Sequence, residues 1–357
     1  MSRNKKLLFW GELPPDVYHG ISLSNELILS TLSEEFDLYK VKDNASFKST
    51  PLKLFSLFIS ILKLIYFSFK KPNIYYLNLP MSYLGLRKTI FSIYLIRFIS
   101  PKTKVITHLH RGDYLEFIKE KKHKELLKKA FKHITAIIVL SEISSTELIQ
   151  SGLIHKDKII VIHNSVKILT PKESIDVYRQ VNDDAPYLYC LCNYIPSKRI
   201  HSLVRIVNNS NFIKVKFNGA KSSDEYMDEL LNIDRKTICD FGGVIENQNK
   251  EKKLNSAYAL VLPSLNEGMP LVILESLAQG TPVICFNVGF ISDYLGINYP
   301  GLVKELSDDA LKEKIKWLQN LTYDEYHKLR KTSFNIFWEQ YSQKKLKRII
   351  LDRFEKI

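Results

Sequence analysis

The sequence predicts an α/β protein made of two doubly wound domains, each a parallel sheet covered by helices. Short apolar strands alternate with helical stretches along most of the 357 residues, a pattern typical of parallel sheets that are buried on both faces. The length exceeds what one hydrophobic core usually supports, which indicates two domains. A polar stretch without sustained periodicity, with prolines near both ends, interrupts the alternation near the middle of the chain and is typical of a linker.

The first half alternates from its start. The expected strands are 6–10, 37–41, 73–79, 104–110, 136–141 and 158–164. The expected helices are 21–32, 52–69, 86–100, 124–133 and 144–152. We therefore assign residues 1–166 to an N-terminal Rossmann-like domain and residues 167–184 to the linker.

The alternation restarts after the linker. The expected strands are 187–194, 213–219, 237–243, 259–264 and 282–288, and the expected helices between them are 198–207, 224–233, 249–258 and 271–280. Residues 185–330 are assigned to a C-terminal domain of the same type. Residues 331–357 are expected to form a C-terminal helix that could pack back on the first domain.

Two common classes of nucleotide-dependent enzyme lack their usual loop here. Neither half contains G-x-G-x-x-G or G-x-x-x-x-G-K-[ST], so the phosphate-binding devices of dinucleotide dehydrogenases and P-loop kinases are missing. Ligands of open parallel sheets bind beyond the carboxyl ends of the strands, where helices begin. Those loops are where candidate residues are sought.

The cysteine and acidic residues do not show the spacing that predicts a metal site. Cys190, Cys192, Cys239 and Cys285 lie in or beside apolar runs without metal-ligand spacing, which favours buried free thiols. No D-x-D pair stands in a suitable place. The N-terminal apolar run is too short for a secretory signal, so a cytoplasmic location is expected.

Positive charge is concentrated in one segment of the first half. The formal net charge is +14, and residues 44–111 contain eleven Lys and Arg but no Asp or Glu. Such a segment seeks an anionic partner, either nucleic acid or an anionic membrane surface. No nucleic-acid-binding module is recognisable, and the mixture of aromatic, aliphatic and basic residues in 52–69 and 86–100 suits a bilayer interface.

The helix at 52–69 carries a narrow polar stripe. Lys53, Ser56, Ser60 and Lys63 are spaced three and four apart, which places them on one side of a helix that is otherwise apolar. A transmembrane span would not show a repeated polar stripe. We expect a helix that packs on the sheet and also touches lipid, and a fully covered core helix is the alternative.

The densest chemical motif is ALVLPSLNEGMPLVILESLAQGTPVICF at 259–286. Glu267 lies in the loop before the expected helix and Glu275 lies inside it, so the two carboxylates can converge on one ligand. Gly268 permits a close backbone approach, and the N–H groups of Met269 and Leu271 at the helix start could hold a phosphate.

This motif resembles the E-x7-E signature of glycosyltransferase family 4. Other segments agree with the family: VIHNSV at 161–166, FNG at 217–219, FGGV at 241–244, and the opening loop GELPPDVYHGISLS at 11–24. The resemblance implies the GT-B fold, in which two Rossmann-like domains with parallel sheets face each other across a cleft. It also implies a retaining, metal-independent transfer from a nucleotide diphosphate sugar, with no cofactor.

The resemblance implies that residues 1–166 form the domain that faces the acceptor and the membrane, and that residues 185–330 form the nucleotide-sugar-binding domain. It also assigns roles to individual residues of the second domain. It implies that Glu275 binds the ribose hydroxyls, that Glu267 contacts the transferred sugar as a catalytic residue, and that the backbone of Gly268, Met269 and Leu271 meets the diphosphate or the sugar. Gly243 and Val244 would lie by the nucleobase. Lys198 stands where the family has a Lys for the diphosphate, whereas Asn193 stands where the family has Arg, so the neighbouring Arg199 is the candidate replacement.

Two residues of the first domain complete the implied site. Gly20 would be the point of the opening loop nearest the donor, and His110 resembles the family's strand-end His near the reacting sugar, with a structural His as the alternative. Arg111 and Asp113 share the loop of His110, and their roles stay open.

The sequence therefore predicts a retaining hexosyltransferase of the bacterial surface-polysaccharide type, which acts on a lipid-linked saccharide or polysaccharide precursor such as O-antigen or capsule. It is expected to bind the anionic inner face of the cell membrane through residues 44–111. A non-catalytic nucleotide-sugar-binding GT-B protein, suggested by Asn193, and a GT-B epimerase are the alternatives. UDP and GDP donors are not distinguished.

Overall fold

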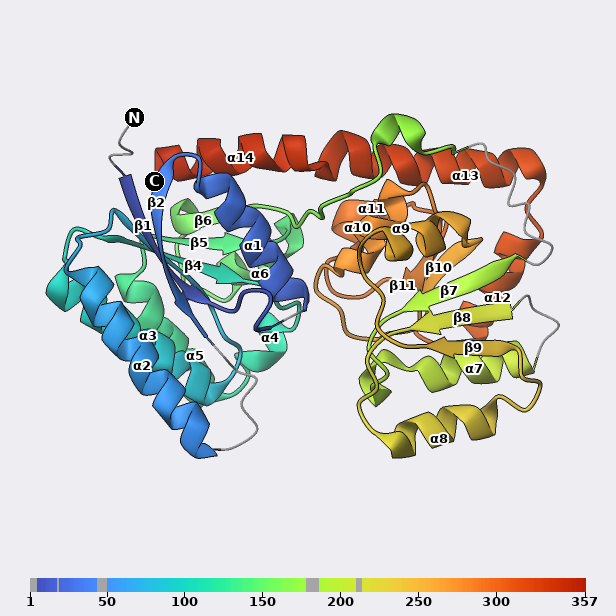
Figure 1. The fold of residues 1–357 in the computed structure, drawn as a ribbon, viewed down its shortest axis with the longest axis horizontal. Helices are drawn as coiled ribbons and strands as arrows, with labels where there is room; N and C mark the ends of the chain where they lie inside the picture. Colours follow the sequence, from blue (N-terminus) through green and yellow to red (C-terminus); the bar gives the residue numbers. More distant parts are fainter. Residues whose placement is uncertain (1–4, 18, 44–49, 178–185, 210–213) are drawn as a thin grey trace. The chain divides into compact units, whose positions relative to one another are not determined.

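The computed structural model describes residues 5–17, 19–43, 50–177, 186–209 and 214–357. The chain divides into two compact units: Met1–Ser165 with Gln343–Ile357, and Val166–Ser342. Residues 178–184 of the predicted linker, and Lys48 of the basic segment, lie outside the described residues. Figure 1 shows the elements of each unit.

The first unit is built on a six-stranded parallel sheet in the order β2-β1-β3-β4-β5-β6. Its strands are β1 (Lys5–Gly11), β2 (Phe36–Lys42), β3 (Ile74–Asn78), β4 (Lys104–Leu109), β5 (Ala136–Val139) and β6 (Ile159–Val161). Its helices are α1 (Gly20–Leu32), α2 (Thr50–Ser68), α3 (Tyr83–Ile99), α4 (Tyr114–Phe117), α5 (Lys121–His133), α6 (Glu142–Gln150) and α14 (Gln343–Lys356), with a 3-10 turn η1 (Lys156–Lys158).

Helices cover both faces of this sheet, as the near-continuous apolar strands require. Successive side chains of a strand point to opposite faces, so Leu8 packs with residues of α2, α3 and α5, whereas Leu7 packs with residues of α1 and α14. In Figure 1, α14 lies beside α1 on one side of the sheet, and α2, α3 and α5 lie on the other.

The second unit repeats the plan with a parallel sheet in the order β12-β11-β10-β7-β8-β9. Its strands are β7 (Tyr187–Leu191), β8 (Lys214–Asn218), β9 (Cys239–Gly242), β10 (Ala259–Leu262), β11 (Val283–Phe286) and β12 (Leu302–Val303). Its helices are α7 (Ile200–Asn208), α8 (Asp224–Ile233), α9 (Asn247–Ser256), α10 (Leu271–Ala278), α11 (Ile291–Leu295), α12 (Asp308–Gln319) and α13 (Tyr323–Ile336). Short helical turns are η2 (Lys172–Ser174), η3 (Pro196–Lys198) and η4 (Phe337–Tyr341).

The predicted α/β class with two parallel sheets is confirmed. Every strand pair in both sheets is parallel. The carboxyl ends of neighbouring strands therefore lie at one edge of each sheet, where the loops that follow β4 and β10 carry His110 and Glu267.

The structure contradicts one of the two predictions for the helix at 52–69, which forms most of α2. Ser60, in the predicted polar stripe, is buried and its hydroxyl donates to the Lys42 carbonyl at 3.4 Å, while Phe55, Phe58 and Tyr66 are exposed. The alternative of a fully covered core helix is therefore wrong. The helix is apolar on most sides, so one apolar side faces outward while a serine of the polar stripe faces the protein.

Candidate active site

The loop after β10 carries Glu267 close to the start of α10. The buried strand β10 leads into this loop, and α10 begins at Leu271 after Pro270 without a side-chain cap. Gly289 holds the loop from the other side: its φ is +55°, and a Cβ there would lie 1.7 Å from the Glu267 carbonyl oxygen. Only glycine permits this close approach, so the backbone at Glu267 is held in one position.

Glu267 forms an ion pair with Lys198. The Lys198 Nζ lies 2.7 Å from Glu267 Oε1, and the side chains are 26% and 10% exposed. Lys198 ends the turn η3, which follows β7. The structure thus brings together the lysine predicted for the diphosphate and the carboxylate predicted for the sugar, and each compensates the other's buried charge.

Glu275, one turn inside α10, is also paired with a lysine. Its carboxylate accepts a hydrogen bond of 2.5 Å from Lys250 Nζ on α9. Burial raises the pKa of Glu275, and the neighbouring Lys250 opposes that rise by favouring the ionised form. Lys250 was missed by the sequence analysis, because no motif or spacing links a lysine of the 249–258 helix to Glu275.

Asn218, the last residue of β8, joins the end of β9 to α9 by hydrogen bonds. Asn218 donates to the Gly243 carbonyl oxygen at 2.7 Å, and its own Oδ1 accepts from Lys253 Nζ at 2.9 Å and from the Tyr189 hydroxyl at 3.0 Å. Val244 is exposed and lines a surface hollow with residues of the α9 start. Gly243 is thus fixed by a side chain of the neighbouring strand.

Asn193 and Arg199 are held by other partners. Arg199 has a left-handed φ of 54°, and its guanidinium pairs with Asp308 at 2.5 Å and donates to Ser202 at 3.1 Å. The Asn193 side-chain oxygen accepts from the Ala220 N–H at 3.3 Å. The structure therefore brings Lys198, and not Arg199, to Glu267.

In the first unit, His110 follows β4 and joins a network of neutral side chains. Asn78 Nδ2 lies 2.9 Å from His110 Nε2, and Asn78 Oδ1 accepts from Asn25 Nδ2 at 2.8 Å. The Asn78 amide nitrogen can only donate, and its two hydrogens go to Asn25 Oδ1 at 2.9 Å and to His110 Nε2. Nε2 is then the acceptor, and the ring proton sits on Nδ1.

Burial keeps this histidine uncharged. Burial lowers the pKa of His110 to about 3, and the charge of His19 adds to the effect. Burial and His110 likewise lower the pKa of His108, whose ring lies 3.8 Å from that of His110 and whose Nδ1 bonds the Tyr76 hydroxyl at 2.7 Å. His110 can therefore offer a neutral N–H but not a positive charge at neutral pH.

Gly20 is the first residue of α1, and His19 caps that helix. His19 Nδ1 accepts from the Ile21 N–H at 3.2 Å, and His19 Nε2 lies 2.8 Å from Glu12. The hydrogen bond to Glu12 raises the pKa of His19. The His19–Glu12 contact therefore ties the opening loop to the start of α1, and it is an ion pair when His19 is protonated.

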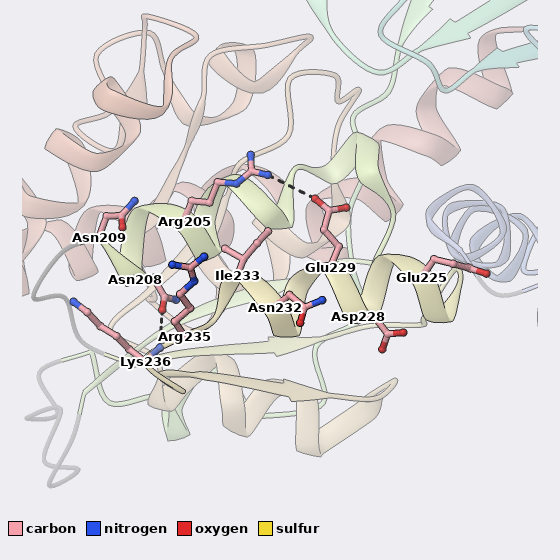
Figure 2. A pocket seen from close by; sticks show the side chains of 10 residues that line it. All are labelled: Arg205, Asn208, Asn209, Glu225, Asp228, Glu229, Asn232, Ile233, Arg235 and Lys236. Carbon is pink, nitrogen blue, oxygen red and sulfur yellow. Dashed lines mark hydrogen bonds and ion pairs between the residues drawn. The ribbon is translucent and has the colours of Figure 1, made fainter.

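A large open groove lies elsewhere in the second unit. It measures about 950 Å³, runs along α7 and α8, and contains the Arg205–Glu229 pair at 3.7 Å (Figure 2). None of the predicted site residues lines it. We therefore place the candidate site at the carboxyl ends of the strands and not in this groove.

The described residues provide neither a metal-binding cluster nor a membrane-spanning helix. They contain no group of three or more His, Cys, Asp or Glu side chains placed to hold a metal ion. Among the same residues, no helix combines the length and apolarity needed to cross a bilayer.

Comparison with known families finds a match within the second unit. Residues 171–335 match the family model described as Glycosyl transferases group 1. The match covers a little less than half of the chain. The finding covers Lys198, Glu267 and Glu275, whose individual roles it does not test.

Curated relatives of the chain are glycosyltransferases by name. A putative teichuronic acid biosynthesis glycosyltransferase, TuaC of Bacillus subtilis, is 42% identical over 73 residues, which are 20% of this chain and 19% of the relative. The O-antigen chain mannosyltransferase RfbU of Salmonella typhimurium is 22% identical over 182 residues, half of each chain. The chain thus spans half or less of the length of these relatives.

Solved structures extend the likeness to the whole fold. Anabaena HepE, crystallised with UDP and glucose, matches with a TM-score of 0.74 at 14% identity, covering 99% of this chain and 100% of HepE. Sucrose-phosphate synthase of Thermosynechococcus elongatus matches with a TM-score of 0.76 at 15% identity, covering 99% of both chains. The chain therefore has a GT-B fold, as predicted.

Proposed function

We propose that the chain is a retaining glycosyltransferase that moves a sugar from a nucleotide diphosphate sugar to a lipid-linked saccharide or polysaccharide precursor. The observation that carries the proposal is the pair of lysine-bound carboxylates, Glu267 and Glu275, around the start of α10 in the group 1 domain. Both lie at the carboxyl edge of a parallel sheet, where ligands of such sheets bind.

Each part of the donor would contact a different group of residues in the site. The two oxygens of Glu275 suit the vicinal hydroxyls of a ribose, with Lys250 keeping the carboxylate ionised. Lys198 would move its interaction from Glu267 to the diphosphate when the donor binds, and Glu267 would then accept hydroxyls of the sugar. Gly268, Met269 and Leu271 supply backbone beside the diphosphate, and Gly243 and Val244 lie toward the nucleobase.

The transfer needs stabilisation of the leaving nucleotide more than it needs a protein base. The bond between the anomeric carbon and the diphosphate breaks while the acceptor oxygen bonds to the same face, and the acceptor proton passes to the departing phosphate oxygen. Lys198 and the α10 start would stabilise the negative charge that develops, which is an electrostatic contribution of several kcal/mol in comparable sites. No metal is needed in this scheme.

His110 would orient the sugar and not act as a base. Its Nδ1 carries the proton while Nε2 is bound by Asn78, so a neutral N–H is available to a sugar hydroxyl. Its low pKa makes it a poor proton acceptor at neutral pH.

The exposed side of α2 and α3 supports an acceptor held at a membrane. Exposed large apolar side chains gather on these helices, among them Phe55, Phe58, Leu62, Tyr66, Leu84, Phe91, Tyr94 and Phe98, the last 87% exposed. We call this set the α2/α3 apolar face. Lys63, Lys70, Lys71 and Arg87 are exposed near it, and this combination suits an anionic bilayer surface. We therefore propose peripheral binding at the inner face of the cell membrane.

Two relatives agree with a polymer-building role by their names, which refer to teichuronic acid and O-antigen chains. A non-catalytic binding protein remains the second candidate, since Asn193 stands in place of the family Arg and Arg199 is bound to Asp308. A GT-B epimerase has no comparable need for the α2/α3 apolar face.

A nucleotide-sugar panel separates these candidates. The purified chain is incubated with UDP- and GDP-sugars and a membrane lipid extract, and nucleotide release and product are followed by mass spectrometry. Transfer, or slow donor hydrolysis, is the expected result. Binding without turnover would support the non-catalytic protein, interconversion of donor sugars would support the epimerase, and no binding to any donor would overturn the proposal.

A further inference from the structure

The open groove of about 950 Å³ along α7 and α8, here called the α7/α8 groove, takes no part in the candidate active site. Its lining comes from the second half of α7, from α8 and from the turn that follows α8. Six of its ten lining residues carry a charge: Arg205, Glu225, Asp228, Glu229, Arg235 and Lys236. A partner would therefore be held there mainly by electrostatic contacts.

The charges of the groove are separated along α8. Figure 2 shows Glu225 and Asp228 toward one end of this helix and Arg235 and Lys236 toward the other. The two carboxylates lie in the first half of α8, and the two basic residues follow its end at Ile233. Glu225, Asp228 and Arg235 are exposed, and none of them forms an ion pair within the described part of the chain. Their charges are therefore open to an outside partner.

The groove as a whole is electrically balanced. Three basic and three acidic side chains line it, so their formal charges cancel, whereas the whole chain carries +14. A nucleic acid or an anionic bilayer would meet three carboxylates in the groove and is attracted more strongly by the basic segments elsewhere. The groove instead suits a protein surface that carries both signs of charge in the reverse order.

A second copy of this chain presents that reverse order. When two identical helices pack antiparallel about a two-fold axis, the same surface is used on both copies. Asp228 of each copy would then face Arg235 of the other. The positive end of each α8 dipole would also lie beside the negative end of its counterpart.

An exposed leucine lies between the two charged groups of α8. Leu231 is 53% exposed and follows Asp228 by three residues, which is the spacing of side chains on one helical face. It lies near the midpoint between Asp228 and Arg235 in the sequence. An axis at this midpoint would bring the two Leu231 side chains together and remove apolar surface from water.

We propose that the α7/α8 groove is an interface between two copies of this chain, packed antiparallel about a two-fold axis. Asp228 pairs with Arg235 of the second copy, and Leu231 lies at the centre. Copies of a chain with a net charge of +14 repel each other, so self-association needs a surface where opposite charges meet. The inference goes beyond the proposed function and does not depend on it.

Sedimentation equilibrium of the full-length protein at about 1–100 μM tests the interface, since small polar interfaces are often weak. The wild type is expected to form a dimer within this range. D228K and R235E each convert two attractive contacts of the symmetric dimer into two repulsive ones, and each should raise the dissociation constant roughly tenfold or more. L231D should also weaken the dimer, because it places two carboxylates at the axis.

An equimolar mixture of D228K and R235E is the decisive sample. In a mixed dimer each altered charge faces an opposite charge, so the mixture should dimerise with about the wild-type affinity. Only an interface in which these two positions meet gives loss in each variant and recovery in the mixture.

Two controls leave the groove unchanged. D324K reverses an exposed aspartate at the start of α13, and F55S/F58S/L84S removes part of the α2/α3 apolar face. Both should dimerise like the wild type. Thermal unfolding of every variant shows whether it is folded.

Three results would overturn the inference. The first is a monomer at every concentration. The second is a dimer that persists unchanged in folded D228K, R235E and L231D, including one that only F55S/F58S/L84S abolishes, because the copies would then meet through another surface. The third is a mixture of D228K and R235E that stays monomeric, because the two charges would then not face each other.

Discussion

The two units hold different side chains at the carboxyl edges of similar sheets. In the second unit, the half-buried Glu267 and the buried Glu275 are each held by a lysine. In the first unit, the edge carries a neutral histidine bound to an asparagine pair, and the outer helices expose apolar side chains. The difference agrees with our proposal that charged groups of the second unit bind the nucleotide diphosphate and that neutral or apolar groups of the first unit meet the acceptor.

Removing one carboxylate charge of the second unit should have the largest effect. In E275Q the side chain keeps its size but can no longer accept two ribose hydroxyls as an anion. Hydrogen bonds to charged groups contribute about 1.5–3 kcal/mol each, so nucleotide affinity should fall roughly 100-fold. Isothermal titration with UDP and GDP measures this.

The matched control is E305Q, which neutralises an exposed glutamate of the same unit. It should bind nucleotide like the wild type. Normal nucleotide affinity in folded E275Q would remove Glu275 from the donor site.

The apolar and basic parts of the first unit can be separated on vesicles. Replacing Phe55, Phe58 and Leu84 with Ser should weaken sedimentation with phosphatidylserine-containing vesicles by roughly 30-fold, or about 2 kcal/mol, because partial burial of each side chain is lost. Replacing Lys63, Lys70 and Lys71 with Glu should weaken sedimentation with these vesicles at low salt. At high salt the same replacement should make no difference, because the charges are screened.

Vesicles of phosphatidylcholine alone provide the comparison. The serine variant should lose binding to both vesicle types, whereas the lysine variant should be affected only with the anionic lipid. If neither variant differs from the wild type, the α2/α3 apolar face does not meet lipid, and a second copy of the chain becomes the occupant to test.

Replacing Lys250 tests whether this lysine keeps the Glu275 carboxylate ionised. Burial raises the pKa of Glu275 and Lys250 opposes the rise, so K250M should raise it further. A carboxylate is ionised above its pKa, so nucleotide affinity is full at high pH and falls as pH decreases. In K250M the fall should begin at a higher pH, with a several-fold loss near neutrality.

The pH profile distinguishes this role from direct contact with the donor. K250R restores the positive charge and should restore the profile. If K250M weakens affinity equally at every pH, Lys250 contacts the nucleotide and does not act through Glu275.

The sequence was sufficient for the fold class but not for the partners in the site. Strand and helix alternation predicts two parallel sheets because each apolar strand must be covered on both faces. The E-x7-E motif locates Glu267 and Glu275 because both lie on one strand-loop-helix unit. Lys250 and the Asn25–Asn78 pair come from distant segments, so no local pattern could reveal them.

The sequence also did not predict which side of α2 faces solvent. A helix that is apolar on most sides has no single polar face to mark the solvent side, so the stripe from Lys53 to Lys63 did not identify it. Burial of Ser60 depends on the position of α2 over β2, where the Lys42 carbonyl accepts its hydrogen bond. Such a contact is fixed by tertiary packing.

The smallest effect expected concerns the neutral network of the first unit. The His110 pKa is lowered to about 3 from an ordinary value of 6.5, so its contribution to stability is present above pH 6.5 and is lost progressively as pH falls toward 3. Since the residue His110 keeps some exposure to solvent, which reduces the effect of burial, we expect a contribution of about 1 kcal/mol between pH 7 and pH 5. The neighbouring His108 and His19 are present in both proteins, and burial raises the pKa of Tyr76, so that its hydroxyl stays neutral between pH 5 and pH 7.

In H110Q the side chain can still accept from Asn78 but has no proton to gain. Urea unfolding of both proteins at pH 7 and pH 5 should therefore show a smaller loss of stability on acidification in H110Q than in the wild type. An equal loss in both would mean that His110 is protonated in the folded state. The first unit would then carry a charge at its sheet edge as the second unit does, and the contrast between the two edges would not hold.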